Sequence, residues 1–244
     1  MTPTEPYHRR RLARTPAVVS KAMEVVAAHV DPDARFERLA LDDTSWVDVA
    51  RGWMAGADEL FDALLNGVRW EPNRLFRYDH FVEERRLGSF WRSGRPLPHP
   101  ALAEAQRTIQ RRYRASFDGF SMIQYRNAAD GQAFHRDTDM RWLDDTIIAV
   151  LSLGARRPWQ LRPRGNRYNH DAGHGATFDL QPGDGDLLVM GGRCQADWEH
   201  SVPYLRTPVG VRISLQWRFA QRTGKPFQGA SYGAPLYYSP GKRS

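Results

Sequence analysis

The spacing of apolar residues changes along the chain, from a helical period in the first half to alternation in the second. Apolar positions recur every three or four residues in segments 18–29, 56–68 and 98–113, and this spacing predicts three helices. His29 is expected on the face of the first helix, and prolines open the third. The positions expected to face a core in the second and third helices are Leu60, Phe61, Leu64, Leu65, Leu102, Ala105 and Ile109.

Strand signals dominate from residue 120 onward, with breaks rich in Gly and Asp between them. The expected strands are 121–125, 134–137, 146–153, 159–162, 176–180, 186–190 and 209–219, and residues 39–47 predict one earlier strand. Helices that precede an antiparallel set of strands indicate an α+β fold. We expect one domain over residues 17–221, a basic flexible arm at 1–16, and a tail rich in Gly, Pro and Ser at 222–244, which Phe227 and later tyrosines could hold to the body.

The last predicted strand separates its side chains into two chemically different faces. One face carries Val209, Val211, Ile213, Leu215 and Trp217, and the other carries Arg212, Ser214, Gln216 and Arg218. The first face predicts a core contact. Because a buried guanidinium without a partner is costly, the second face predicts an anionic ligand such as a dicarboxylate.

His135, Asp137 and His200 are candidate metal ligands. In a strand, residues two apart point to the same side, so His135 and Asp137 can reach one ion. Two histidines and one carboxylate occupy one face of an octahedral iron(II) and leave the opposite positions open. Taken alone, His-x-Asp also fits a structural histidine beside a capping aspartate, but the two arginines downstream favour the metal site.

His135, Asp137, His200, Arg212 and Arg218 match, in order and spacing, the pattern of the AlkB family of iron(II)- and 2-oxoglutarate-dependent dioxygenases, which the chain resembles. The likeness extends to segments 125–131, 151–154 and 183–192, and more weakly to 77–79 and 90–91. It implies a double-stranded β-helix, or jelly-roll, core with the N-terminal helices packed on its larger sheet.

The resemblance also implies a set of roles. His135, Asp137 and His200 would hold Fe(II), with O₂ as co-substrate, and Arg212 would pair with the distal carboxylate of 2-oxoglutarate. Arg218 would help to hold the co-substrate or the triad carboxylate. Tyr125 would hydrogen-bond 2-oxoglutarate, although packing is an alternative role for it.

The reaction implied is hydroxylation, because related halogenases replace the triad carboxylate with a small residue and this chain keeps Asp137. The products would be succinate and CO₂, together with formaldehyde where the oxidised group is an N-methyl.

Three residues are candidates for substrate recognition. Asp139 lies two positions past Asp137, where the family reads the polar edge of a flipped base, and its carboxylate could accept from an exocyclic amine. The family usually has an acidic residue next, whereas this chain has Met140. Trp91, or Phe90 beside it, is the candidate for stacking on an extruded base, with plain packing as the alternative.

Charge supports a polyanionic partner. Lys and Arg number 35 against 28 Asp and Glu, which gives a formal charge of +7. We therefore expect methylated or alkylated DNA or RNA, preferably single-stranded, as the partner, with no obligate protein partner evident. Arginine clusters, including 85–86 and 156–167, are either solvated surface or phosphate contacts, and 156–167 is expected as a loop at the barrel mouth.

The same composition excludes other classes. No apolar run reaches membrane-spanning length, and Cys194 is the only cysteine, so we expect a cytoplasmic protein without an internal disulfide. The leading hypothesis is an oxidative demethylase that repairs alkylated nucleic acid. Two alternatives are the same chemistry on a small molecule, protein or lipid, and a basic binding module that keeps the triad passively.

Overall fold

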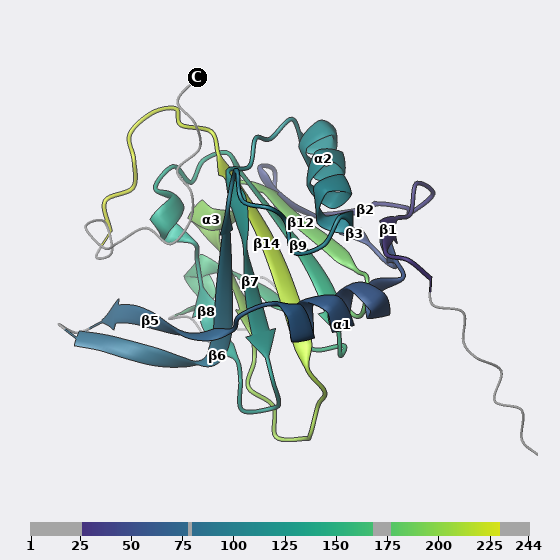
Figure 1. Cartoon of the computed structure of the whole chain (residues 1–244). Helices are drawn as coiled ribbons and strands as arrows, with labels where there is room; N and C mark the ends of the chain where they lie inside the picture. The colour runs from purple at the N-terminus through teal and green to yellow at the C-terminus, as the bar shows by residue number, and fades with distance from the viewer. Residues whose placement is uncertain (1–25, 78–79, 168–176, 230–244) are drawn as a thin grey trace, which may run out of the picture.

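Two antiparallel sheets form the body of the protein in the computed structural model, which describes residues 26–77, 80–167 and 177–229 (Figure 1). The larger sheet has the strand order β2 (Glu37–Ala40), β3 (Ser45–Ala50), β12 (Leu187–Gly192), β9 (Thr146–Gly154), β14 (Arg212–Ala220), β7 (Gly119–Tyr125), β6 (His80–Arg92) and β5 (Glu71–Arg77). The smaller sheet has the order β11 (Phe178–Asp179), β10 (Gln160–Pro163), β13 (Trp198–Val202) and β8 (Gln132–His135). A short pair, β1 (His29–Val30) and β4 (Met54–Ala55), lies beside them.

Helices α1 (Ala57–Gly67) and α2 (Ala101–Tyr113) cover one face of the larger sheet, as Figure 1 shows. Leu60, Leu64, Leu102 and Ile109 are buried in one cluster with residues of β14, β9 and β12. This packing confirms both helices and their predicted inward faces. The helices leave the opposite face of the larger sheet free to face the smaller one.

A second apolar cluster lies between the two sheets. Ile123 and Val150 of the larger sheet pack there with Leu161 of β10 and Trp198 of β13. Strand β14 serves both clusters, since Ile213, Leu215 and Trp217 face the helices and the alternate residues face the interior between the sheets. The architecture confirms the expected α+β double-stranded β-helix.

Several predicted elements differ from the structure. His29 lies in strand β1, not on a helix, and the rest of that predicted helix up to residue 25 is outside the described residues. Segment 39–47 is a hairpin, because Asp42 accepts hydrogen bonds from the backbone N–H groups of Thr44 and Ser45 and so turns the chain. Strands β5, β6 and β13 were not predicted, and β6 contains Phe90 and Trp91.

The predicted basic arm, residues 1–16, lies outside the described residues, as do residues 230–244 of the tail. Within the described part of the tail, the backbone N–H of Phe227 donates to the Arg141 carbonyl at 2.6 Å. The Arg136 guanidinium lies 5.3 Å from the Phe227 ring centroid. Phe227 therefore holds this part of the tail to the body. None of the helices in the described ranges has the length and apolar character needed to cross a bilayer.

Candidate metal centre

His135 and His200 are cross-strand neighbours in the smaller sheet. His135 ends β8, His200 lies in the middle of β13, and the two are direct partners in the antiparallel register. Directly opposed residues place their side chains on the same face, and here the two ring centroids are 4.2 Å apart. Strand pairing therefore brings together two candidate ligands that are 65 positions apart in sequence.

Asp137 completes the triad from outside the strand. Strand β8 runs from Gln132 to His135, so the predicted strand 134–137 began and ended two residues too late, and Asp137 precedes the short 3₁₀ helix η1 (Thr138–Met140). Its Oδ1 lies 3.6 Å from His135 Nε2, and its Oδ2 lies 3.1 Å from Arg218 Nε. The three side chains each offer one ligand atom, and these atoms lie within 4.8 Å of one another. This spacing suits one ion.

Contacts of the two histidines orient their rings. His135 Nδ1 is 2.9 Å from the Ala133 carbonyl, which fixes the proton on Nδ1 and leaves the Nε2 lone pair on the side of Asp137. His200 stacks on Trp159 with the ring centroids 5.6 Å apart. The His135 side chain is 29% exposed, whereas that of Asp137 is 8% exposed, so the site opens toward His135.

All three ligands are in the protonation state that binds a metal at neutral pH. Burial lowers the pKa of His200 to about 3 and also lowers the pKa of His135, so both imidazoles are neutral. Burial alone would raise the pKa of Asp137, but the positive charges around it, that of Arg218 above all, outweigh burial and bring that pKa to about 2. The pocket thus presents two neutral nitrogens and one carboxylate, a set that suits iron(II).

Arg212 fits the expected anchor for a dicarboxylate. Its side chain is fully buried, and Nη2 donates to Ser152 Oγ at 2.8 Å. Nε and Nη1 have no hydrogen-bond partner among the described residues. Burial lowers the pKa of Arg212 to about 10, so the group is still charged at neutral pH. A buried cation with two free donors is completed by an anion, and the distal carboxylate of 2-oxoglutarate has the right charge and shape.

Tyr125 lies directly opposite Arg212 in the β7–β14 register. Its ring centroid is 6.0 Å from the Arg212 guanidinium carbon and 5.3 Å from that of Arg157. Its hydroxyl accepts a 3.3 Å hydrogen bond from Arg86 Nη1. Tyr125 therefore lies beside Arg212, the candidate anchor for 2-oxoglutarate.

Arg86 is a residue of the site that sequence reasoning missed. It was grouped with Arg85 as a surface cluster, yet its side chain is only 11% exposed. It faces the interior of the barrel from β6 and donates twice to the Glu84 carboxylate, at 3.0 Å each. Its charge also contributes to lowering the pKa values of His135, Asp137 and His200. Residues 83–86 are all charged, so no alternation of polar and apolar residues marked Arg86 as an inward-facing side chain.

The three candidate substrate residues are placed differently. Asp139 lies in η1 beside the triad, and its pKa is raised to about 6 by burial, with the Asp137 charge adding to the effect. Phe90 pairs with Ser121 on the triad's side of the larger sheet. Trp91 pairs with Phe120 on the helix side, stacks on it, and donates to the Pro96 carbonyl at 2.7 Å. The sheet separates Trp91 from the triad, so of the two aromatics only Phe90 is on the correct side.

Arginines 156–167 are not the open loop that the sequence suggested. They span β10 and the 3₁₀ helix η2 (Arg164–Arg167), and several have internal partners. Arg156 pairs with Asp186, Arg162 pairs with Glu199 at 2.8 Å, and Arg157 is buried against backbone carbonyls of residues 127 and 130. These three guanidinium groups support the fold.

Comparisons with known proteins agree with this geometry. The "Alpha-ketoglutarate-dependent dioxygenase alkB homolog 3" of Bos taurus is 29% identical over 174 residues, which are 66% of this chain and 61% of that protein. The "DNA oxidative demethylase ALKBH2" of Bos taurus is 26% identical over 179 residues, 67% of this chain and 64% of that protein. The chain thus spans less than two thirds of the length of these relatives.

A solved prolyl hydroxylase from Trichoplax adhaerens, in complex with a hypoxia inducible factor peptide fragment, has the same fold. It aligns with a TM-score of 0.50 at 13% identity and covers 71% of this chain and 83% of its own. The family model of the 2OG-Fe(II) oxygenase superfamily matches residues 57–218. That range includes the triad and both arginines and makes up more than half of the chain, which therefore belongs to the 2OG-Fe(II) oxygenase superfamily.

Proposed function

We propose that this protein is an iron(II)- and 2-oxoglutarate-dependent oxidative demethylase that acts on alkylated bases in nucleic acid. The observation that carries the proposal is the triad together with the uncompensated Arg212, in a chain whose reported relatives are a dioxygenase named alkB homolog 3 and a protein named ALKBH2. One of these relatives bears the name DNA oxidative demethylase. The reaction would release succinate, CO₂ and formaldehyde.

His135, Asp137 and His200 would hold Fe(II). Bound there with 2-oxoglutarate, the metal supplies dioxygen activation coupled to decarboxylation of the keto acid. Arg212, whose Nε and Nη1 have no hydrogen-bond partner among the described residues, would bind the distal carboxylate of 2-oxoglutarate. Arg218 keeps Asp137 ionised and in place, and Tyr125 borders the co-substrate.

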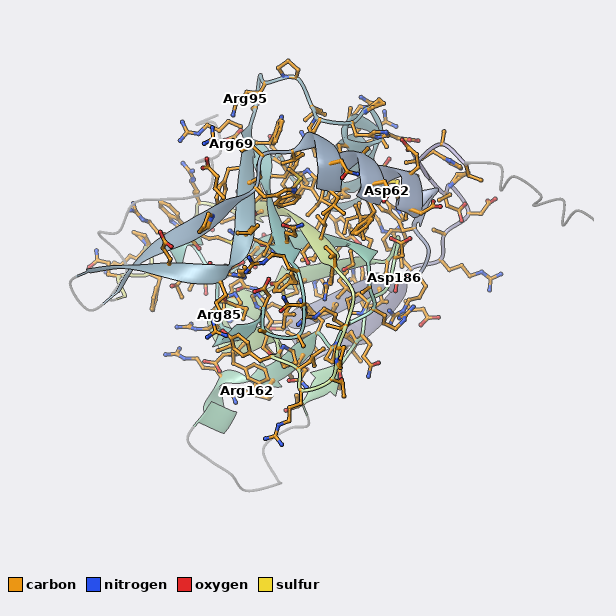
Figure 2. The ribbon with its side chains drawn as sticks, turned by 60° about the horizontal axis from the view of Figure 1, so that its bottom comes forward. Asp62, Arg69, Arg85, Arg95, Arg162 and Asp186 are labelled. Atoms are coloured by element: carbon orange, nitrogen blue, oxygen red, sulfur yellow. The ribbon has the colours of Figure 1, made fainter. Side chains whose placement is uncertain are left out.

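Features around the site support a nucleobase as the substrate. Asp139 places a second carboxylate beside the triad, where it can accept from an exocyclic amine, and Phe90 offers an aromatic ring on the same side of the sheet. In Figure 2 the labelled Arg69, Arg85, Arg95 and Arg162 lie on the side from which the β5–β6 hairpin projects, and the labelled Asp62 and Asp186 lie on the other. A chain with a formal charge of +7 attracts phosphates.

The test uses single-stranded oligonucleotides that carry methylated adenine or cytosine, with the unmethylated strands as controls. The expected result is stoichiometric release of formaldehyde and succinate, which depends on iron(II) and is lost in His135→Ala. Methylated strands that neither bind nor stimulate 2-oxoglutarate turnover would refute the nucleic-acid assignment and leave the oxygenase assignment intact.

A second candidate is the same chemistry on a small molecule, a protein side chain or a lipid. Met140, where the family usually carries an acidic residue, is 3% exposed, and Trp91 does not reach the triad's side of the sheet. Both leave fewer polar and aromatic groups for reading a base. Succinate release driven by a metabolite or peptide, but not by methylated strands, would favour this candidate.

A further inference from the structure

Asp137 is the one triad residue that strand pairing does not hold. His135 and His200 are fixed by the β8–β13 ladder, whereas Asp137 lies two residues past the end of β8. Its backbone N–H donates to Gln195 Oε1 at 2.8 Å, and Gln195 is fully buried. The nitrogen of the same side-chain amide, Gln195 Nε2, donates to the sulfur of Met190 at 3.6 Å. Both ends of the Gln195 amide therefore have a partner.

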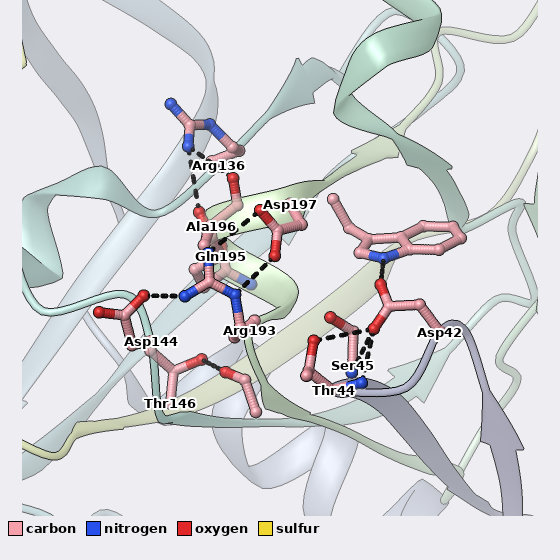
Figure 3. A network of polar contacts seen from close by, with 12 residues as sticks. Asp42, Thr44, Ser45, Arg136, Asp144, Thr146, Arg193, Gln195, Ala196 and Asp197 are labelled. Carbon is pink, nitrogen blue, oxygen red and sulfur yellow. Dashed lines mark hydrogen bonds and ion pairs between the residues drawn. The ribbon is translucent and has the colours of Figure 1, made fainter. Parts of the chain in front are cut away.

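A second contact ties the same segment to the same helix. Arg136 Nη1 donates to the carbonyls of Gln195 and Ala196, at 3.3 and 3.0 Å. These residues belong to the short helix α3 (Cys194–Asp197), and Figure 3 shows Arg136 meeting it from one side. Residues 136 and 137 therefore donate three hydrogen bonds to α3, which hold this segment in place.

Helix α3 is itself held from several directions. Arg193 pairs with Asp197 at 2.8 Å and with Asp144, and Cys194 Sγ donates to the Trp46 carbonyl at 3.3 Å (Figure 3 draws the Arg193 pairs). Strand β13 begins directly after α3 and carries His200. Helix α3 thus contacts the segment that carries Asp137 and leads directly into the strand that carries His200.

We propose that Gln195 is a positioning residue for the iron ligand Asp137. The amide oxygen fixes the peptide N–H where the chain leaves the strand, and so sets the direction in which the Asp137 carboxylate points. Without this acceptor the buried N–H loses its partner, at a free-energy cost that the segment relieves by shifting. A shifted carboxylate weakens metal binding, because second-layer partners typically contribute 10- to 100-fold to metal affinity.

The experiment measures the dissociation constant of Fe(II) by anaerobic titration, without and with 2-oxoglutarate. Gln195→Leu keeps the volume and removes the acceptor, and we expect it to weaken Fe(II) binding by about 10- to 100-fold. Gln195→Glu keeps an oxygen acceptor, and we expect it to bind Fe(II) within about threefold of the wild type or more tightly, since it adds a negative charge.

Gln106→Leu is the matched control. Gln106 Oε1 accepts from Trp217 Nε1 at 3.2 Å on the helix side of the larger sheet, so its loss also leaves an indole N–H without an acceptor, away from the metal. We expect this variant to lose stability and keep its Fe(II) affinity. The unfolding midpoint of each metal-free variant separates the two effects.

The proposal is overturned if folded Gln195→Leu binds Fe(II) like the wild type, or if Gln106→Leu weakens binding to the same extent. Should Gln195→Leu fail to fold, Gln195→Met fills the site with a more flexible chain and takes the same test. Arg136→Met removes the second contact and is expected to weaken binding less than Gln195→Leu, because it leaves the Asp137 N–H bonded.

Discussion

Arg212 and Arg218 lie on one face of β14 but differ in their electrostatic environment. Arg218 is neutralised by Asp137 at 3.1 Å and donates to Gln216 Oε1 at 2.6 Å. Within the described residues, the hydrogen-bond partner of Arg212 is the neutral hydroxyl of Ser152. Strand β14 therefore brings one paired and one uncompensated guanidinium to the site, and the uncompensated one is the candidate anchor for an anionic co-substrate.

Arg212→Met should separate the two properties of this arginine. Removal of an uncompensated buried cation leaves the stability of the ligand-free protein unchanged or higher. Removal of the carboxylate's partner raises the dissociation constant of 2-oxoglutarate by about 100-fold, since truncating one partner of a buried charge pair costs about 2–5 kcal/mol. Calorimetric titration with 2-oxoglutarate and urea unfolding measure the two quantities. A large fall in stability with unchanged 2-oxoglutarate affinity would contradict the assignment.

At this scale the sequence predicted much of the site. The resemblance to the AlkB family named the triad, Arg212 and Arg218 as candidates, and alternation along β14 predicted that the two arginines share a face. Arg86 was missed because its neighbour Arg85 is exposed, and two adjacent arginines in a strand are indistinguishable by composition. Phe90 and Trp91 were not separated for the same reason: one step along a strand reverses the face.

At the scale of elements, Gly191 of β12 is the cross-strand partner of Trp46 in β3, and the Trp46 ring lies directly over it. A Cβ at Gly191 would lie 2.0 Å from Trp46 Cζ2, although the glycine has no unusual backbone angle. Trp46 is itself held by Tyr113, 5.8 Å away, and by the Arg38 guanidinium at 3.8 Å. Glycine here serves close packing between β12 and β3.

Gly191→Ala is expected to lower the free energy of unfolding by about 1–3 kcal/mol, the range for overpacking a filled core. Urea denaturation measures it. Gly67→Ala is the control, because nothing lies within 4 Å of its Cβ position at the end of α1, and it should be neutral or slightly stabilising. Equal stabilities for the two variants would rule out the packing role.

Asp186 joins the start of β12 to the turn after β3. Its carboxylate accepts from the N–H groups of Gly52 and Gly183 and from Arg51, each at 2.8 Å. Burial alone would raise the pKa of Asp186, but these donors outweigh it and the pKa is lowered. The folded state therefore holds the ionised form more strongly than the unfolded chain does.

A lowered carboxyl pKa adds stability above the unfolded value of about 4, and this stability disappears as the pH falls below that value. We expect the free energy of unfolding of the wild type to exceed that of Asp186→Asn by about 2 kcal/mol at pH 7, which is in the range for hydrogen bonds to a charged group. The difference should shrink between pH 5 and pH 3. Urea unfolding measures this difference in stability. If it stays constant between pH 5 and pH 3, the charge of Asp186 is not the source of the added stability.

The elements that sequence reasoning missed share a cause. All five residues of β13 are buried, so Trp198–Val202 shows no alternation of apolar and polar residues. Strand β6 carries consecutive charged residues, including a partly buried ion pair between Glu84 and Arg86, so its sequence pattern is that of a surface loop. Helices α1 and α2 and strand β14 were predicted because each has one apolar and one polar face.

At the scale of the whole molecule, ligand binding should stabilise the fold, since the triad links β8 to β13 and Arg212 lies in the larger sheet. Fe(II) with 2-oxoglutarate at 100 times the dissociation constant adds about 2.7 kcal/mol, which corresponds to a rise in melting temperature of about 5–10 °C. Asp137→Ala should lose most of this rise. Anaerobic differential scanning calorimetry measures it, and an equal rise in the variant would exclude Asp137 as a ligand.

The pairing of His135 with His200 has a consequence for how the site assembles. A slip of β8 by a single residue would turn one imidazole to the opposite face, and no ion could then bridge the two strands. Strands β8 and β13 lie far apart in the chain, so their pairing is a non-local contact. Binding of one ion by both histidines requires that this pairing has formed. The time course of metal binding during refolding would therefore report when β8 and β13 have paired.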